Sequence, residues 1–264
     1  MNTRKIYRNS ILVLTLTYSA LSFGQSSWNY GIWTYLDSMS VASSFSMLDM
    51  YPEPGTPAFL LDEYTYFETR LERNTPRGQE AIMDAKIGGD TILSRFTEAF
   101  GMPITKERTP QLYALLMGMK ETAGTLATMH AKKFYQRIRP FVYYHDNTLT
   151  PDAEESLRKN GSYPSGHSCM FFAISLVLQE ICSERQVEIM RRGYEGGRSR
   201  LIVGVHWLSD VQAGRLLAAT IVARLHAHHE FMQQLELAKD EFRRLKSRQE
   251  PVAINIRRLP RGVD

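Results

Sequence analysis

Three short segments of the chain hold residues that together suit phosphoryl chemistry. A phosphoryl group carries negative charge on three oxygens, so a catalyst of its transfer consists mainly of positioned positive charge. The reaction also needs an attacking atom on one side and a proton donor on the other, and two histidines can supply both. The segments are Lys132 with Arg139-Pro140, then Pro164-Ser165-Gly166-His167, and finally Ser199-Arg200 with His206 and Asp210.

The third segment offers a candidate nucleophile. His206 and Asp210 are four positions apart, so a helix beginning near His206 would place the carboxylate beside the imidazole. An ionised Asp210 would accept the proton of one ring nitrogen and leave the other nitrogen free to attack. This spacing alone more often marks an incidental pair on a helix. The preceding Ser199-Arg200 favours the functional interpretation, in which Ser199 has a supporting role.

The second segment offers a candidate proton donor at the start of a helix. His167 opens an apolar run that we expect to be helical, and helix N-termini present free N–H groups that suit phosphate. Ser165 can cap this helix and also donate to phosphate. Gly166 lets the backbone approach an oxyanion closely.

Three cations are candidates for holding the phosphoryl oxygens. Lys132 would act as a point charge, and Arg139 and Arg200 would act through their planar forks. Any one of them alone would be taken for an ordinary surface cation. We expect that ordinary role for the neighbouring Lys133 and Arg137.

The elements that must position these residues are predicted to be helices. Thr75-Pro76 and Thr109-Pro110 each pair a capping residue with proline at the first helical position, which is typical of a helix start. Lys132 and Arg139, seven positions apart on one predicted helix, would share a face. Strand-like alternation is nearly absent, so we expect an all-α fold, a single compact domain of packed helices. The predicted helices are 60–73, 76–100 with a break at Gly88-Gly89, 110–138, 151–160, 167–182, 183–196, 207–229 and 231–248, while 200–205 is ambiguous.

The first 24 residues have the pattern of a secretory signal peptide. A positive start is followed by the apolar stretch 11–16, which is far shorter than the roughly 20 residues of a membrane-spanning helix. We predict cleavage before Gln25 and a periplasmic or secreted protein, with an uncleaved anchor as the alternative. The all-α domain would cover 25–248, with an irregular first part at 25–61 and a basic, flexible tail at 249–264.

Charge and motifs exclude several classes of partner. The chain has 32 Lys and Arg against 28 Asp and Glu, and the signal removes three of the cations, so the mature protein is almost neutral. This balance gives no reason to expect a nucleic acid partner. No later apolar segment is long enough to span a membrane. No metal motif, Walker loop or dinucleotide fingerprint is present, so we predict no metal and no cofactor, and we assign the cluster His226, His228 and His229 to a helix end or the surface.

The order and spacing of the three segments resemble the type 2 phosphatidic acid phosphatase superfamily. That group includes bacterial class A non-specific acid phosphatases, membrane lipid phosphatases and vanadium haloperoxidases. The chain resembles the class A acid phosphatases most, over about 62–242, including Arg73-Asn74-Thr75, the run from Tyr163 to His167 and the run from Asp240 to Phe242.

The resemblance implies an all-α fold and metal-independent hydrolysis of phosphomonoesters through a phosphohistidine. By resemblance, His206 is the nucleophile, Asp210 orients it, and His167 protonates the leaving group and then activates water. Expected substrates are nucleotides, sugar phosphates and aryl phosphates, with vanadate and molybdate as inhibitors. Phosphotransfer and nucleotide hydrolysis are expected side activities, and a homo-oligomer is left open.

Three alternatives remain at this point. A vanadate-dependent haloperoxidase could use the same cations, since vanadate resembles a phosphoryl transition state. A lipid phosphatase is disfavoured because the sequence predicts no spanning helix. A non-catalytic phosphate-binding protein would not explain a His-Asp pair accompanied by a second histidine.

Overall fold

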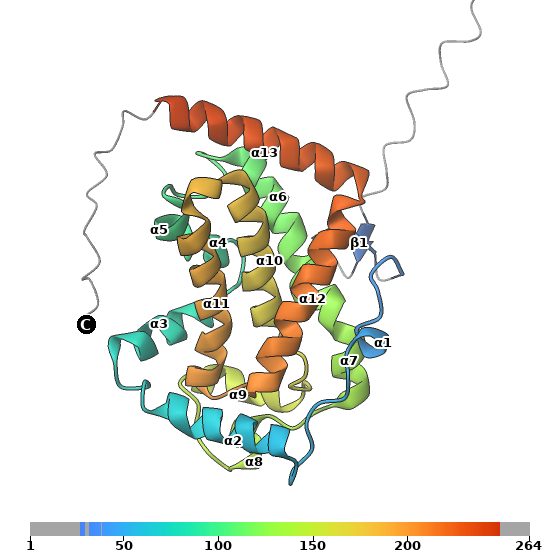
Figure 1. Cartoon of the computed structure of the whole chain (residues 1–264), viewed down its shortest axis with the longest axis vertical. Coiled ribbons are helices and arrows are strands. Elements are labelled where there is room, and N and C mark those ends of the chain that lie inside the picture. The colour runs from blue at the N-terminus through green and yellow to red at the C-terminus, as the bar shows by residue number, and fades with distance from the viewer. Residues whose placement is uncertain (1–26, 30–31, 38, 249–264) are drawn as a thin grey trace, which may run out of the picture.

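The computed structural model describes residues 27–29, 32–37 and 39–248 (Figure 1). The predicted signal peptide and the predicted basic tail lie outside the described residues. A short antiparallel hairpin, β1 (Ser27–Asn29) and β2 (Ile32–Thr34), precedes a chain that is otherwise helical. The expected all-α class is therefore confirmed, with this hairpin as a small addition. None of the helices in the described ranges has the length and apolar character needed to cross a membrane.

The two longest of the first helices each begin at a proline that follows a threonine. After the short α1 (Ser44–Met47), α2 covers Pro57–Arg70 and begins three residues earlier than predicted, because Pro57 occupies its first turn and the Thr56 hydroxyl accepts from the Phe59 N–H at 3.2 Å. The helix predicted over 76–100 is interrupted around Gly88-Gly89, as predicted, but it is also divided a second time, which the sequence did not predict. It is three pieces, α3 (Pro76–Asp84), α4 (Thr91–Ser94) and α5 (Thr97–Phe100), and Gly89 adopts a positive φ of 55° between the first two.

The helix predicted over 110–138 also differs from the structure. It consists of α6 (Pro110–Glu121), a π-helical turn η1 (Thr122–Leu126) and α7 (Ala127–Tyr135), and it ends at Gln136 in the left-handed region. Arg139 therefore lies beyond the helix in extended chain, so it does not share a helical face with Lys132. The next residue is Pro140, which disfavours helical backbone at the residue before it. Two short helices follow, α8 (Pro140–Tyr143) and α9 (Pro151–Arg158).

The centre of the molecule is α10 (Gly166–Ile181), surrounded by α6, α11 (Gln186–Val203) and α12 (Leu208–His226) (Figure 1). Its apolar residues point to several sides, as expected of a helix enclosed by others. Gly196 of α11 lets this helix approach α10 closely, since a Cβ there would lie 2.1 Å from the Phe171 ring. The last helix, α13 (His229–Arg248), crosses the far end of the bundle and packs on α6.

The chain reverses sharply between α11 and α12. The helix predicted to end at residue 196 continues to Val203, which resolves the ambiguous segment 200–205 mostly as helix. Gly204 ends it with a φ of 89°, and α12 begins four residues later at Leu208, after His206 and Trp207. This reversal brings the end of α11 and the start of α12 beside the start of α10, so the second and third sequence segments meet.

Candidate active site

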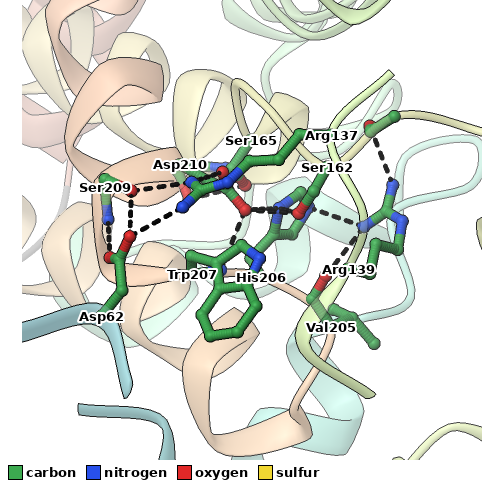
Figure 2. Close-up of polar contacts among 12 residues, drawn as sticks. Asp62, Arg137, Arg139, Ser162, Ser165, Val205, His206, Trp207, Ser209 and Asp210 are labelled. Atoms are coloured by element: carbon green, nitrogen blue, oxygen red, sulfur yellow. Dashed lines mark hydrogen bonds and ion pairs between the residues drawn. The ribbon is translucent and has the colours of Figure 1, made fainter. Parts of the chain in front are cut away.

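His206 lies in the turn between α11 and α12, with both ring nitrogens engaged (Figure 2). Its Nδ1 lies 3.1 Å from Asp210 Oδ2, as the four-residue spacing predicted. Its Nε2 lies 3.2 Å from Arg139 Nη1. A guanidinium can only donate, so Nε2 accepts and the ring proton resides on Nδ1, where the carboxylate accepts it. The unprotonated nitrogen is therefore Nε2, on the side of Arg139.

The electrostatics keep both predicted histidines neutral. Burial and the Arg139 guanidinium hold the pKa of His206 well below its usual value. Burial and the nearby Arg200 do the same to the pKa of His167. Burial alone would raise the pKa of the Asp210 carboxyl, but the Arg137 guanidinium and the hydrogen bond with His206 hold it below its usual range. Asp210 is thus an ionised hydrogen-bond acceptor beside a neutral imidazole.

The three predicted phosphate-binding cations lie around this pair. Arg139 is held by main-chain oxygens, with Nε donating to Leu157 at 2.9 Å and Nη1 donating to Val205 at 2.9 Å. Lys132 Nζ donates to the Gly161 carbonyl at 2.8 Å. Burial and the nearby Arg139 lower the pKa of Lys132 to about 7 and that of Arg200 to about 9.

Arg200 shows where an anion would be accommodated. Its Nε and Nη1 are buried, and neither has a hydrogen-bond partner within the described part of the chain. Buried donors are nearly always satisfied, and Arg200 acts electrostatically on both Arg139 and His167, so its two free donors are available to an anion bound beside these groups. Its neighbour Ser199, for which a supporting role is predicted, donates its hydroxyl to Asp84 Oδ2 at 2.5 Å and accepts from Arg77 Nη2 at 2.9 Å.

His167 is the second residue of α10 and is half-buried. Its Nε2 donates to the Ala85 carbonyl at 3.1 Å, so Nδ1 is the nitrogen that can take up a further proton. Ser165 caps the helix as predicted, since its hydroxyl accepts from the Ser168 N–H at 3.3 Å. Gly166 has a packing role that the sequence did not reveal. A Cβ there would lie 2.8 Å from the Gly124 carbonyl oxygen in the π-helical turn.

Sequence reasoning missed several residues around Asp210, and its expectation for Arg137 is wrong. Arg137 is not a surface cation but is 4% exposed, and it forms ion pairs with Asp62 at 2.8 Å and with Asp210 at 2.6 Å. Ser162 donates its hydroxyl proton to Asp210 and lies 3.3 Å from His206 Nδ1. The pattern Arg-Ile-Arg-Pro could have indicated that Arg137 is buried like Arg139. The proline favours extended chain before it, and alternate residues of extended chain point to one side.

Among the remaining histidines, His226 lies in the last turn of α12. His226 pairs with Glu180 at 2.9 Å, consistent with a place at a helix end. In the described ranges, no three or more His, Cys, Asp and Glu side chains gather in a way that could hold a metal ion.

The two neutral histidines predict how stability depends on pH. Below about pH 6.5 each imidazole takes up a proton in the unfolded chain, whereas the fold excludes it. The free energy of unfolding should therefore fall on acidification, by about 1.4 kcal/mol per pH unit for each histidine. His206→Asn should reduce this slope in urea melts between about pH 4.5 and 6.5. The exposed His145→Asn is the matched control, and equal slopes in the His206 variant and wild type would contradict the exclusion of that proton.

The chain matches known acid phosphatases over most of its length. The family model described as the PAP2 superfamily matches residues 112–232, a span that contains all three segments. A non-specific acid phosphatase of Providencia stuartii is 47% identical over 212 residues, which cover 80% of this chain and 86% of that protein. A non-specific acid phosphatase of Salmonella typhimurium is 40% identical over 192 residues, covering 72% and 77%. An acid phosphatase of Zymomonas mobilis is 33% identical over 196 residues, 74% of each chain. The chain therefore belongs to the PAP2 superfamily and, within it, to the acid phosphatases.

Proposed function

We propose that this acid phosphatase hydrolyses small phosphomonoesters in two steps, through a phosphohistidine on His206 Nε2. One observation carries the proposal. The proton of His206 is held on Nδ1 by an ionised Asp210, so Nε2 carries no proton and faces Arg139, with Lys132 also nearby. Such a ring is ready to attack without first losing a proton.

In the first step, the phosphoryl oxygens would accept from Arg139, Arg200 and Lys132. His206 Nε2 attacks phosphorus, and the bond from phosphorus to the leaving oxygen breaks. The leaving oxygen takes a proton from His167, which becomes neutral. Since burial favours the neutral form of His167 in the free protein, the proton arrives with the bound phosphate, whose charge stabilises the imidazolium.

In the second step, a water molecule attacks phosphorus and gives its proton to the neutral His167. The bond between phosphorus and His206 Nε2 breaks, and inorganic phosphate leaves with His206 neutral again. An alcohol in place of water would receive the phosphoryl group by the same route, which accounts for a phosphotransferase side activity.

The charges of the site suit work below neutral pH. The pKa of Lys132 is about 7, so acidic conditions keep its ammonium charged. The lowered pKa of His206 keeps its Nε2 unprotonated under the same conditions. These two shifts support an optimum on the acidic side of neutral, between the protonation of His206 and the loss of charge from Lys132.

The substrate class is proposed to be broad and the location to be outside the cytoplasm. The described cations and histidines recognise the phosphoryl group that nucleotides, sugar phosphates and aryl phosphates share. The signal-like pattern of the first 24 residues supports export to the periplasm or the medium. The N-terminal sequence of the mature protein tests this location, and a chain that still begins at Met1 would exclude cleavage.

A chromogenic aryl phosphate assay tests the metal-free mechanism. Activity should survive EDTA, because the positive charge at the site comes from side chains. Vanadate should inhibit competitively, since it resembles the phosphoryl transition state and would occupy the same donors. Loss of activity in EDTA with recovery on addition of zinc or magnesium would contradict the proposal. Sulfate serves as the matched control anion, because it cannot adopt the five-coordinate geometry of vanadate and should inhibit more weakly.

A further inference from the structure

The buried guanidinium of Arg137 joins the carboxylates of Asp62 and Asp210 on the Nδ1 side of His206, the proposed nucleophile (Figure 2). Arg137 Nη1 donates to Asp210 Oδ1 at 2.6 Å, and Nη2 donates to Asp62 Oδ2 at 2.8 Å. Ser209 bridges the same groups, because its hydroxyl lies 2.7 Å from Arg137 Nη1 and 2.6 Å from Asp62 Oδ2. The segment after α7, the helix α2 and the start of α12 thus meet at one guanidinium.

Arg137, Asp62 and Asp210 form a triad that is almost completely buried. The side chains of Arg137, Asp62 and Asp210 are 3%, 2% and 0% exposed. The guanidinium carbon of Arg137 lies 4.7 Å from the centre of the Tyr51 ring and 5.4 Å from that of Trp207. Burying three charges costs free energy that well-packed apolar residues would not require, so stability alone is weak grounds for the arrangement.

The triad fixes the orientation of the Asp210 carboxylate. Asp62 Oδ1 accepts the Ser209 N–H at 2.8 Å, and Asp210 Oδ2 accepts the Trp207 N–H at 2.9 Å, so both acids are anchored to the start of α12. Arg137 occupies Oδ1 of Asp210. The other oxygen, Oδ2, is left for His206 and Ser162.

Arg137 also limits how strongly Asp210 attracts a proton to His206. The groups facing Asp210 are Arg137, His206, the Ser162 hydroxyl and the Trp207 N–H. On its other side His206 faces Arg139, with Lys132 nearby. A carboxylate that shares its charge with a guanidinium stabilises an imidazolium less than a free carboxylate does. Loss of Arg137 would therefore raise the pH at which the Asp210–His206 pair takes up a proton.

We infer that Arg137, which pairs with both Asp62 and Asp210, is a positioning residue that keeps the nucleophile unprotonated at acidic pH through its ion pair with Asp210. This inference rests on the proposed role of His206. In the proposed mechanism, the acid limb of kcat/KM reports protonation of His206 in the free enzyme. Arg137 would then set the lower edge of the working pH range without touching substrate.

Three variants separate charge from structure. Arg137→Gln removes the charge and should move the acid limb of kcat/KM upward by about one to two pH units. Asp62→Asn disturbs the same buried network but leaves Arg137 to act on Asp210 alone. The acid limb of kcat/KM should therefore move to lower pH. Arg137→Lys keeps the charge and should keep the limb within about half a unit while kcat falls, because one ammonium cannot hold both carboxylates.

The direction in which the acid limb of kcat/KM moves in each variant distinguishes the charge effect from a purely structural role. A purely structural role predicts that the Gln and Asn variants lose activity without moving the limb, or move it in one direction, and either result overturns the inference. A Lys variant that shifts as far as the Gln variant overturns it as well. If Arg137→Gln does not fold, the Asp62→Asn shift against wild type still decides, since an unchanged or raised limb contradicts the charge effect.

An NMR titration separates this inference from the proposed mechanism. The ¹⁵N shifts of the His206 ring in the phosphate-free protein report its protonation without any turnover. If the titration midpoint moves as predicted but wild type yields no phosphohistidine on alkaline quench, the mechanism fails and the positioning role stands. If the phosphohistidine is trapped but the midpoint is unchanged in Arg137→Gln, the positioning role fails alone.

Discussion

His206→Ala is expected to abolish turnover of phosphomonoesters, with a loss on the order of 10⁶ in kcat by analogy with removal of a nucleophile in a serine protease. No neighbouring group can replace the ring. Arg139, which faces Nε2, is a donor only, and the Ser162 hydroxyl lies on the opposite side, at Nδ1. Transfer would then have to occur directly to water, without the covalent intermediate that divides the reaction into two easier steps.

Quenching in an alkaline denaturant with a ³²P-labelled substrate provides the direct measurement for this variant. Wild type should retain an acid-labile, base-stable label on the protein, as expected of a phosphohistidine, and the variant should retain none. His226→Ala is the matched control, since that ring pairs with Glu180 and lies outside the proposed site. Undiminished turnover in His206→Ala, or an equal label in both proteins, would exclude His206 as the nucleophile.

Contacts between residues close in the sequence were predicted more accurately than the bounds of the helices that carry them. His206 and Asp210 could be paired from spacing alone, because the interaction closes within one helical turn. The cap at Ser165 was likewise a local feature. Lys132 and Arg139 were predicted to converge for the wrong reason, since the helix was expected to continue to residue 138, whereas it ends at Tyr135. Their convergence depends on the carbonyls of Gly161 and Val205 instead, which are tertiary contacts.

The missed residues share a physical cause. Arg137 looked like a surface cation because its two acidic partners lie 75 and 73 positions away along the chain. Nothing near Asp62 in the sequence marks it as a cap for α12, which begins at Leu208. The π-helical turn at Thr122–Leu126 has no recognised sequence signal, yet it accounts for the glycine at position 166. Long-range pairing of charges and close backbone packing are decided by the whole fold, so a local pattern cannot predict them.

Asp210→Asn is expected to lower kcat by about 10² to 10⁴ while the fold is retained, by analogy with the orienting carboxylate of serine proteases. Every group around this side chain is a donor. Oδ2 accepts from His206, from Ser162 and from the Trp207 N–H, and Oδ1 accepts from Arg137. An amide offers one acceptor oxygen and brings two protons of its own, so one side of it must confront donors.

The orientation of that amide decides the chemistry. If its NH₂ group turns toward His206, Nδ1 must accept, and the ring proton moves to Nε2, the attacking atom. If the oxygen turns toward His206 instead, the NH₂ group faces Arg137, and a buried donor pair is left unsatisfied. Steady-state kinetics together with ¹⁵N NMR of the His206 ring distinguish the two orientations, since only the first moves the ring proton.

Ser162→Ala is the matched control, because it removes a hydrogen bond to the same oxygen but keeps the charge of Asp210. Its kcat should fall by less than about tenfold. A loss below about threefold in Asp210→Asn would mean that the carboxylate does not set the tautomer of His206.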